Sequence, residues 1–130
     1  ATAPGRGSGR VLVVDDNRDN LDLVLKILRS KGYQTIQALD GEEALEIAQR
    51  ERPALILMDL SIPKMDGFEV TRRLKCLEDF RETPIVALTA HAMKGDREKT
   101  VGAGFDGYIA KPIDVRQFPA LIAKYLSRQG

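Results

Sequence analysis

The chain has 130 residues, close to the commonest size of a single domain. Hydrophobic residues make up 43% and charged residues 30%, a composition typical of a globular domain rather than of a disordered or fibrous chain. The 20 Lys and Arg residues nearly balance the 19 Asp and Glu residues, so the net charge gives no reason to expect binding to nucleic acid or to an anionic membrane.

The cysteine content and the apolar runs limit where the protein works. The single cysteine, Cys76, excludes an internal disulfide framework, and no apolar run approaches the roughly 20 residues that span a bilayer. We therefore expect a cytoplasmic protein. Residues 1–9 are rich in Gly and other turn-forming residues and are predicted to be a flexible linker or tail, so the folded domain is expected to cover residues 10–130.

Strand patterns alternate with helix patterns along the chain. Five short apolar runs are predicted as strands, and two of them run directly into an acid. The runs lie at residues 11–15, 33–39, 54–58, 85–89 and 108–110. Alternating elements with short connections favour a parallel sheet with helices on both faces, which is a doubly wound α/β fold.

Apolar residues at helical spacing predict a helix after each strand. The first helix ends before Gly32, the second begins with Asp40 and Glu43 at capping-box spacing, and the fourth covers about residues 94–103. The apolar positions of the other helices are Leu21, Val24, Leu25 and Leu28, then Ala44, Leu45, Ile47 and Ala48, then Phe68, Leu74 and Leu77, and finally Phe118, Leu121, Ile122, Tyr125 and Leu126. The final stripe is typical of core packing rather than of catalysis.

Polar residues stand where the strands stop. Asp15 and Asp16 close the first strand, Asp59 the third and Thr89 the fourth, while Lys111 follows the fifth. The carboxyl ends of parallel strands meet at one rim, which is where such folds bind ligands. Three carboxylates placed together either raise a pKa or recruit a cation, and oxygen ligands without His or Cys favour Mg²⁺. An ammonium and a hydroxyl beside them suit phosphoryl oxygens.

Each of these residues also has a simpler interpretation. The triplet Asp15-Asp16-Asn17 would simply cap the next helix, because acids and Asn are favoured there. Thr89 favours strands in any case, and Lys111 would be solvated in a loop. Their joint position at the strand ends favours the site.

Four segments together resemble the receiver domains of bacterial response regulators, over roughly residues 10–127. They are Val13-Val14-Asp15-Asp16-Asn17, then Leu57-Met58-Asp59-Leu60-Ser61-Ile62-Pro63 with Met65-Asp66-Gly67, then Ala87-Leu88-Thr89-Ala90, and Gly107-Tyr108-Ile109-Ala110-Lys111-Pro112. The resemblance implies a flavodoxin-like fold with a five-stranded parallel sheet of order 2-1-3-4-5 and five flanking helices. It is strongest to single-domain regulators and to the receivers of hybrid kinases.

The resemblance also implies the chemistry of the site. Asp59 would take a phosphoryl group from a phosphohistidine on a histidine kinase or a histidine phosphotransfer protein, and Lys111 would contact the acyl phosphate. Asp16 and Asp59 would bind Mg²⁺ directly, Asp15 would act partly through water, and the backbone carbonyl of Ser61 would complete the protein ligands.

A switch follows from the same comparison. Thr89 would move toward the phosphoryl group and Tyr108 would turn inward, which would change partner binding on the fourth helix, fifth strand and fifth helix. Tyr108 is alternatively an ordinary strand aromatic. The resemblance also implies that Ser61 and His91 would hold the two positions that tune the reaction rate. A single histidine among oxygen ligands is poor support for zinc. The peptide bond before Pro112 is expected to be cis.

Two other functions compete with this one. A phosphatase of the haloacid-dehalogenase type would need an acid two residues after its nucleophile, but Asp59 is followed there by Ser61 and Asp15 by Asn17. A receiver-like module without phosphorylation would lack some of the acids or the lysine. We therefore expect a phosphoacceptor that is not a turnover enzyme, with a downstream protein target, no nucleic-acid partner, and a monomeric or weakly dimeric state.

Overall fold

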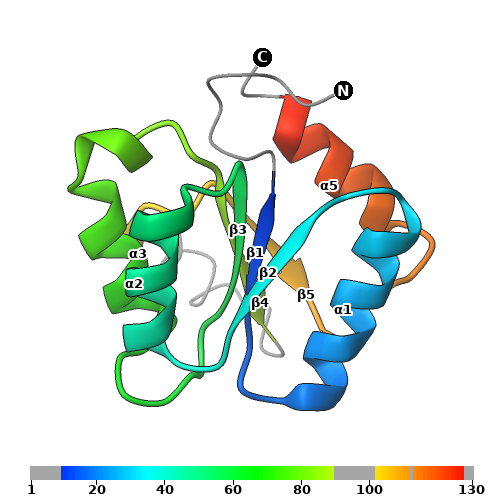
Figure 1. Cartoon of the computed structure of the whole chain (residues 1–130), viewed down its shortest axis with the longest axis horizontal. Coiled ribbons are helices and arrows are strands. Elements are labelled where there is room, and N and C mark those ends of the chain that lie inside the picture. The colour runs from blue at the N-terminus through cyan, green and yellow to red at the C-terminus, as the bar shows by residue number, and fades with distance from the viewer. Residues whose placement is uncertain (1–9, 90–101, 112, 128–130) are drawn as a thin grey trace.

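A computed structural model describes residues 10–89, 102–111 and 113–127 of the chain, and Figure 1 shows their arrangement. The strands are β1 (Val11–Val14), β2 (Thr35–Ala38), β3 (Leu55–Asp59), β4 (Ile85–Thr89) and β5 (Gly107–Ala110). The helices are α1 (Arg18–Ser30), α2 (Gly41–Glu51), α3 (Gly67–Lys75), the 3₁₀-helix η1 (Glu78–Phe80) and α5 (Phe118–Ser127). The helix predicted over about residues 94–103 lies almost entirely outside the described residues.

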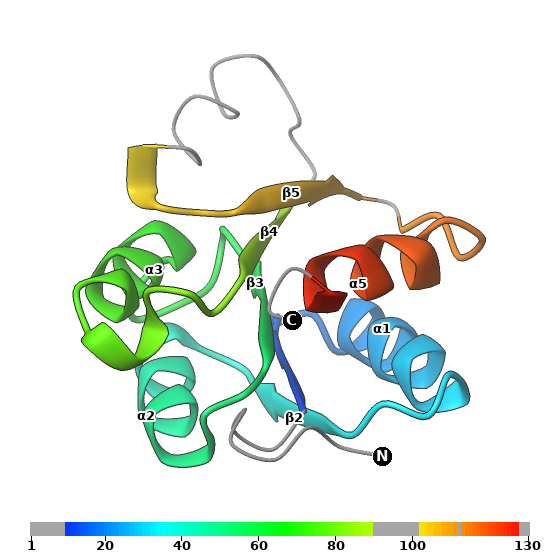
Figure 2. The ribbon, with the colours of Figure 1, turned by 90° about the horizontal axis from the view of Figure 1, so that it is seen from above.

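The five strands form one parallel sheet in the order β2-β1-β3-β4-β5, which confirms the predicted doubly wound fold and strand order. Viewed from above, α1 and α5 cover one face of the sheet and α2 and α3 cover the other (Figure 2). Each face has its own buried apolar cluster, one with α1 and α5 and the other with α2 and α3. The central strands are apolar up to the polar residues Asp59 and Thr89 at their carboxyl ends, because both of their faces are covered.

The helix ends follow the predicted signals. After α1, Gly32 adopts φ 87°, and the N–H groups of Gly32 and Tyr33 donate to the carbonyls of Arg29 and Leu28, as in a Schellman motif. At the start of α2, Asp40 accepts from the Glu43 N–H while the Glu43 side chain accepts from the Leu39 N–H. The predicted capping-box-like start is therefore confirmed at the Asp40 side chain, while the return bond from Glu43 goes to Leu39, one residue before the N-cap.

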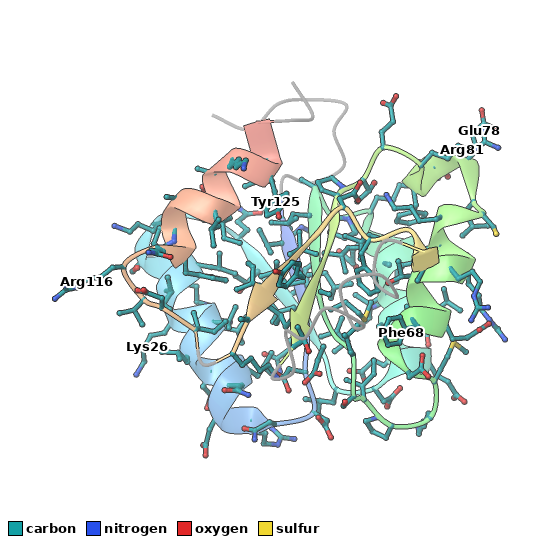
Figure 3. All side chains as sticks on the ribbon, turned by 180° about the vertical axis from the view of Figure 1, so that it is seen from behind. Lys26, Phe68, Glu78, Arg81, Arg116 and Tyr125 are labelled. Carbon is teal, nitrogen blue, oxygen red and sulfur yellow. The ribbon has the colours of Figure 1, made fainter. Side chains whose placement is uncertain are left out.

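Several predicted boundaries were wrong by one or two residues. β2 is shorter than residues 33–39, because Tyr33 belongs to the turn that closes α1. α3 ends at Lys75, so Leu77 is not part of that helix; it precedes η1 and is 37% exposed. Figure 3 shows Glu78 and Arg81, which lie between the carboxyl end of α3 and the start of β4. Among the described residues, no helix has the length and apolar character needed to cross a membrane.

Candidate functional site

Two buried acids lie side by side at the carboxyl rim of the sheet. Asp59 is the last residue of β3 and Asp15 directly follows β1, whose Val14 pairs with Met58. Asp15 is fully buried and Asp59 is 7% exposed. They meet because β1 and β3 are neighbours in the sheet, although 44 positions separate them in the sequence.

The same kind of hydrogen bond from a backbone N–H orients both acids. The Asn17 N–H donates to Asp15 Oδ1 and the Ser61 N–H donates to Asp59 Oδ1, each at 2.9 Å. Each carboxylate therefore keeps its Oδ2 for other partners. The sequence patterns considered above do not predict these bonds, although an Asp whose side chain bonds the N–H two residues further on is a recurrent turn feature.

Lys111 joins the two carboxylates. Its ammonium lies 2.8 Å from Asp59 Oδ2 and 3.1 Å from Asp15 Oδ2, and its side chain is only 14% exposed. The pairing of β4 with β5 brings the lysine to the acids, because the Lys111 N–H continues the ladder by donating to the Thr89 carbonyl at 2.7 Å. The interpretation of Lys111 as a solvated loop residue is therefore wrong.

Burial and charge shift the pKa values of this group in a defined way. Burial, together with the neighbouring Asp59, raises the pKa of Asp15 to about 6, against the opposing hydrogen bonds from Asn17 and Lys111. Burial disfavours the Lys111 ammonium, but its contacts with Asp59 and Asp15 outweigh this and raise the pKa of the lysine. Lys111 is therefore charged at neutral pH, and below about pH 6 Asp15 would hold a proton that competes with a metal ion.

Asp16 completes a cluster suited to a hard cation. One carboxylate oxygen from each of Asp15, Asp16 and Asp59 lies within 4.8 Å of the others, and Asp16 is exposed to solvent. Three carboxylates against one ammonium leave an excess of negative charge. Carboxylate oxygens with an open, solvated side suit Mg²⁺, which keeps part of its water shell. The residues present therefore fit the metal that the sequence predicts.

The helix-capping interpretation of the first acidic segment is correct for its last residue. Asn17 is the N-cap of α1, and its side chain accepts from the Asn20 N–H. Asp15 does not cap the helix and instead turns to the lysine. The segment therefore serves both purposes, one residue for the helix and another for the site.

The proposed switch residues share one face of neighbouring strands. Tyr108 on β5 pairs with Ala87 on β4, and Thr89 lies two residues beyond Ala87. Tyr108 is half-buried against the apolar cluster of α2 and α3, while Thr89 is 6% exposed at the rim. The predictions for His91 and Pro112 lie outside the described residues.

The fold and the rim define the class of the protein: a flavodoxin-like α/β domain with an acidic pocket and a lysine at the carboxyl ends of its strands. The family model for the response regulator receiver domain matches residues 11–123, and the chain belongs to this family. Receiver domains are phosphoacceptor signalling modules of two-component systems rather than turnover enzymes.

Similar proteins support the assignment. The polar-differentiation response regulators DivK of Brucella anthropi and Brucella ovis are each 44% identical over 116 residues, which is 89% of this chain and 94% of those proteins. The receiver domain of the sensor histidine kinase PA1611 from Pseudomonas aeruginosa PAO1, solved with a magnesium ion coordinated in its active site cleft, is 37% identical with a TM-score of 0.85. That match covers 92% of this chain and 98% of the other.

Proposed function

We propose that Asp59 accepts a phosphoryl group from a phosphohistidine on a histidine kinase or histidine phosphotransfer protein, with Mg²⁺ bound by Asp15, Asp16, Asp59 and the Ser61 carbonyl. The observation that carries the proposal is the shared contact of Lys111 with Asp59 and Asp15 beside the exposed Asp16. The magnesium ion in the related PA1611 receiver supports the choice of metal.

The phosphoryl transfer depends on the placement of the nucleophile and of positive charges more than on acid–base chemistry. A carboxylate oxygen of Asp59 attacks phosphorus while the phosphorus–nitrogen bond of the phosphohistidine breaks, and the imidazole nitrogen leaves with the electron pair. Mg²⁺ would offset negative charge on the phosphoryl oxygens. Lys111 already lies at Asp59 and would supply a second positive charge there, so little reorganisation is needed. The product is an aspartyl phosphate.

The stored phosphoryl group would act through the neighbouring strands. New oxygens on Asp59 would attract the Thr89 hydroxyl, and Tyr108, on the same face as Thr89, would turn inward. The surface of β5, α5 and the helix predicted before β5 would then bind a downstream protein with altered affinity. Ser61 and His91 would tune how long the phosphoryl group lasts. This function fits a cytoplasmic monomer or weak dimer without a nucleic-acid partner.

The test is the intact mass of the protein after incubation with acetyl phosphate, with and without Mg²⁺. We expect one added phosphoryl group that requires Mg²⁺, is absent from Asp59→Asn, and persists in Asp22→Asn, which alters an exposed acid on α1. An adduct that survives in Asp59→Asn would contradict the assignment of the acceptor. Continuous donor hydrolysis at high turnover would favour an enzyme instead.

A further inference from the structure

The amino end of α2 is seated directly on the loop that follows Asp59. The Gly41 N–H donates to the Pro63 carbonyl at 3.2 Å, and the same carbonyl accepts from the Met65 N–H at 2.8 Å. A first-turn N–H of a helix has no partner within its helix, so the loop supplies one. The loop is thereby tied to α2, an element that contributes no ligand to the site.

The contact leaves no room for a side chain at Gly41. A Cβ atom there would lie 1.8 Å from the Met65 carbonyl oxygen and 2.7 Å from the Met65 carbonyl carbon, distances at which backbone must move. The constraint is steric, because Gly41 is an ordinary helical residue that does not have positive φ. Any larger residue would displace the loop rather than one flexible side chain.

The loop is held at two further points. Gly67 packs on the end of β3, where its Cβ would lie 2.5 Å from the Asp59 carbonyl oxygen, and its N–H donates to the Leu60 carbonyl. Lys64 has φ 70°, an uncommon conformation for a residue with a side chain, and its ammonium lies 3.7 Å from the Asp40 carboxylate at the start of α2. Such a conformation persists only where the surrounding contacts impose it.

Ser61 is the residue in this loop that matters for chemistry. Its N–H holds Asp59 Oδ1 at 2.9 Å, and its carbonyl is the ligand assigned above to Mg²⁺. We propose that Gly41 is a positioning residue for this site: by letting α2 seat on the Pro63–Met65 turn, it fixes the backbone of Ser61 relative to Asp59. The metal-binding part of this inference rests on the proposed function.

The first experiment uses metal-free protein and so does not depend on Mg²⁺. In Gly41→Ala, we expect the amide resonances of Ser61 and Gly67 to shift. The matched control is Gly32→Ala, which strains a positive-φ glycine with no atom within 4 Å of its Cβ. Gly32 precedes the amino end of β2, whereas the loop follows the carboxyl end of β3 in the same parallel sheet. The control variant should lower thermal stability without moving those resonances. Unmoved Ser61 and Gly67 resonances in folded Gly41→Ala would overturn the proposal.

The second experiment titrates Mg²⁺. Gly41→Ala should raise the Kd for Mg²⁺ by about tenfold, the usual size for a residue that orients a ligand, while Gly32→Ala should leave it unchanged. If Gly41→Ala does not fold, Asp40→Ala replaces it, because it removes the helix cap and the Lys64 contact without a clash and should raise the Kd by about threefold. An unchanged Kd in the folded variant would overturn the proposal. Failure of the native chain to bind Mg²⁺ would instead defeat the proposed function, and the amide shifts would still decide the role of Gly41.

Discussion

Asp15 should impose a pH dependence on the metal-free protein. Its pKa of about 6 in the folded state exceeds the ordinary value of 3.8, so the native state binds this proton more tightly than the unfolded state does. The contribution of Asp15 to the free energy of unfolding should therefore fall as the pH rises from about 4 to about 6, by on the order of 3 kcal/mol, and then level off. Urea denaturation at a series of pH values measures this.

The variant Asp15→Asn isolates this contribution from that of the other acids. Its difference from the native protein should grow through the same pH window, whereas Asp22→Asn on the exposed side of α1 should track the native curve. If Asp15→Asn also tracks the native curve, the proton is held elsewhere in the cluster.

Single residues also show what the sequence can and cannot predict about the site. Asp15, Asp59, Thr89 and Lys111 are recognisable because each ends or follows an apolar run, and a parallel sheet must bring those ends together. The role of Gly41 is different, because it depends on backbone atoms 24 positions away in Met65. No local pattern encodes that distance.

At the scale of one element, α3 contains a polar atom that destabilises it. Thr71 is fully buried, and its hydroxyl has no hydrogen-bond partner within the part of the chain that the structure describes. Thr71→Val keeps the shape and removes the hydroxyl, so it should raise the free energy of unfolding by about 1 kcal/mol. Chemical denaturation tests this against Thr35→Val, which loses the bond from Arg29 Nε and should show no gain. Equal behaviour of the two variants would mean that the Thr71 hydroxyl finds a partner in solution.

The carboxyl end of α3 is tied to the start of β5 by a half-buried lysine. Lys75 Nζ donates to Asp106 Oδ2 at 3.0 Å and to the Thr83 carbonyl at 2.7 Å, and Asp106 Oδ2 also accepts from the Ile85 N–H. The ring of Phe68, labelled in Figure 3, meets Phe105 edge to face with centroids 6.0 Å apart in the same region. These contacts hold the segment that leads into Tyr108.

Replacing Lys75 should lower the free energy of unfolding more than replacing an exposed arginine on the same helix. Lys75→Met leaves the Asp106 carboxylate short of its cation and should lower the free energy of unfolding by about 2 kcal/mol. Arg73→Met breaks an exposed pair with Glu69 and should cost less than about 1 kcal/mol. Similar losses in the two variants, measured by urea denaturation, would show that the tie to β5 is weak.

The whole-molecule architecture was predictable to different degrees from different signals. The alternation of apolar runs with helical stripes predicts a doubly wound sheet, because short crossovers leave little else. Periodicity does not fix the strand order, which came from the family resemblance and which the sheet confirms. The ends of the helices were the least predictable feature, because the end of α3 depends on how the chain turns into η1.

Mg²⁺ should stabilise the whole fold through the rim. A ligand that binds only the native state stabilises it by mass action, by about 2.7 kcal/mol at a hundred times its Kd. We therefore expect the thermal midpoint of the native chain to rise with added Mg²⁺ and to return on chelation. The rise should shrink below about pH 6, because Asp15 then holds a proton in competition with the metal. It should largely vanish in Asp59→Asn, whereas an equal rise there would place the binding elsewhere on the surface.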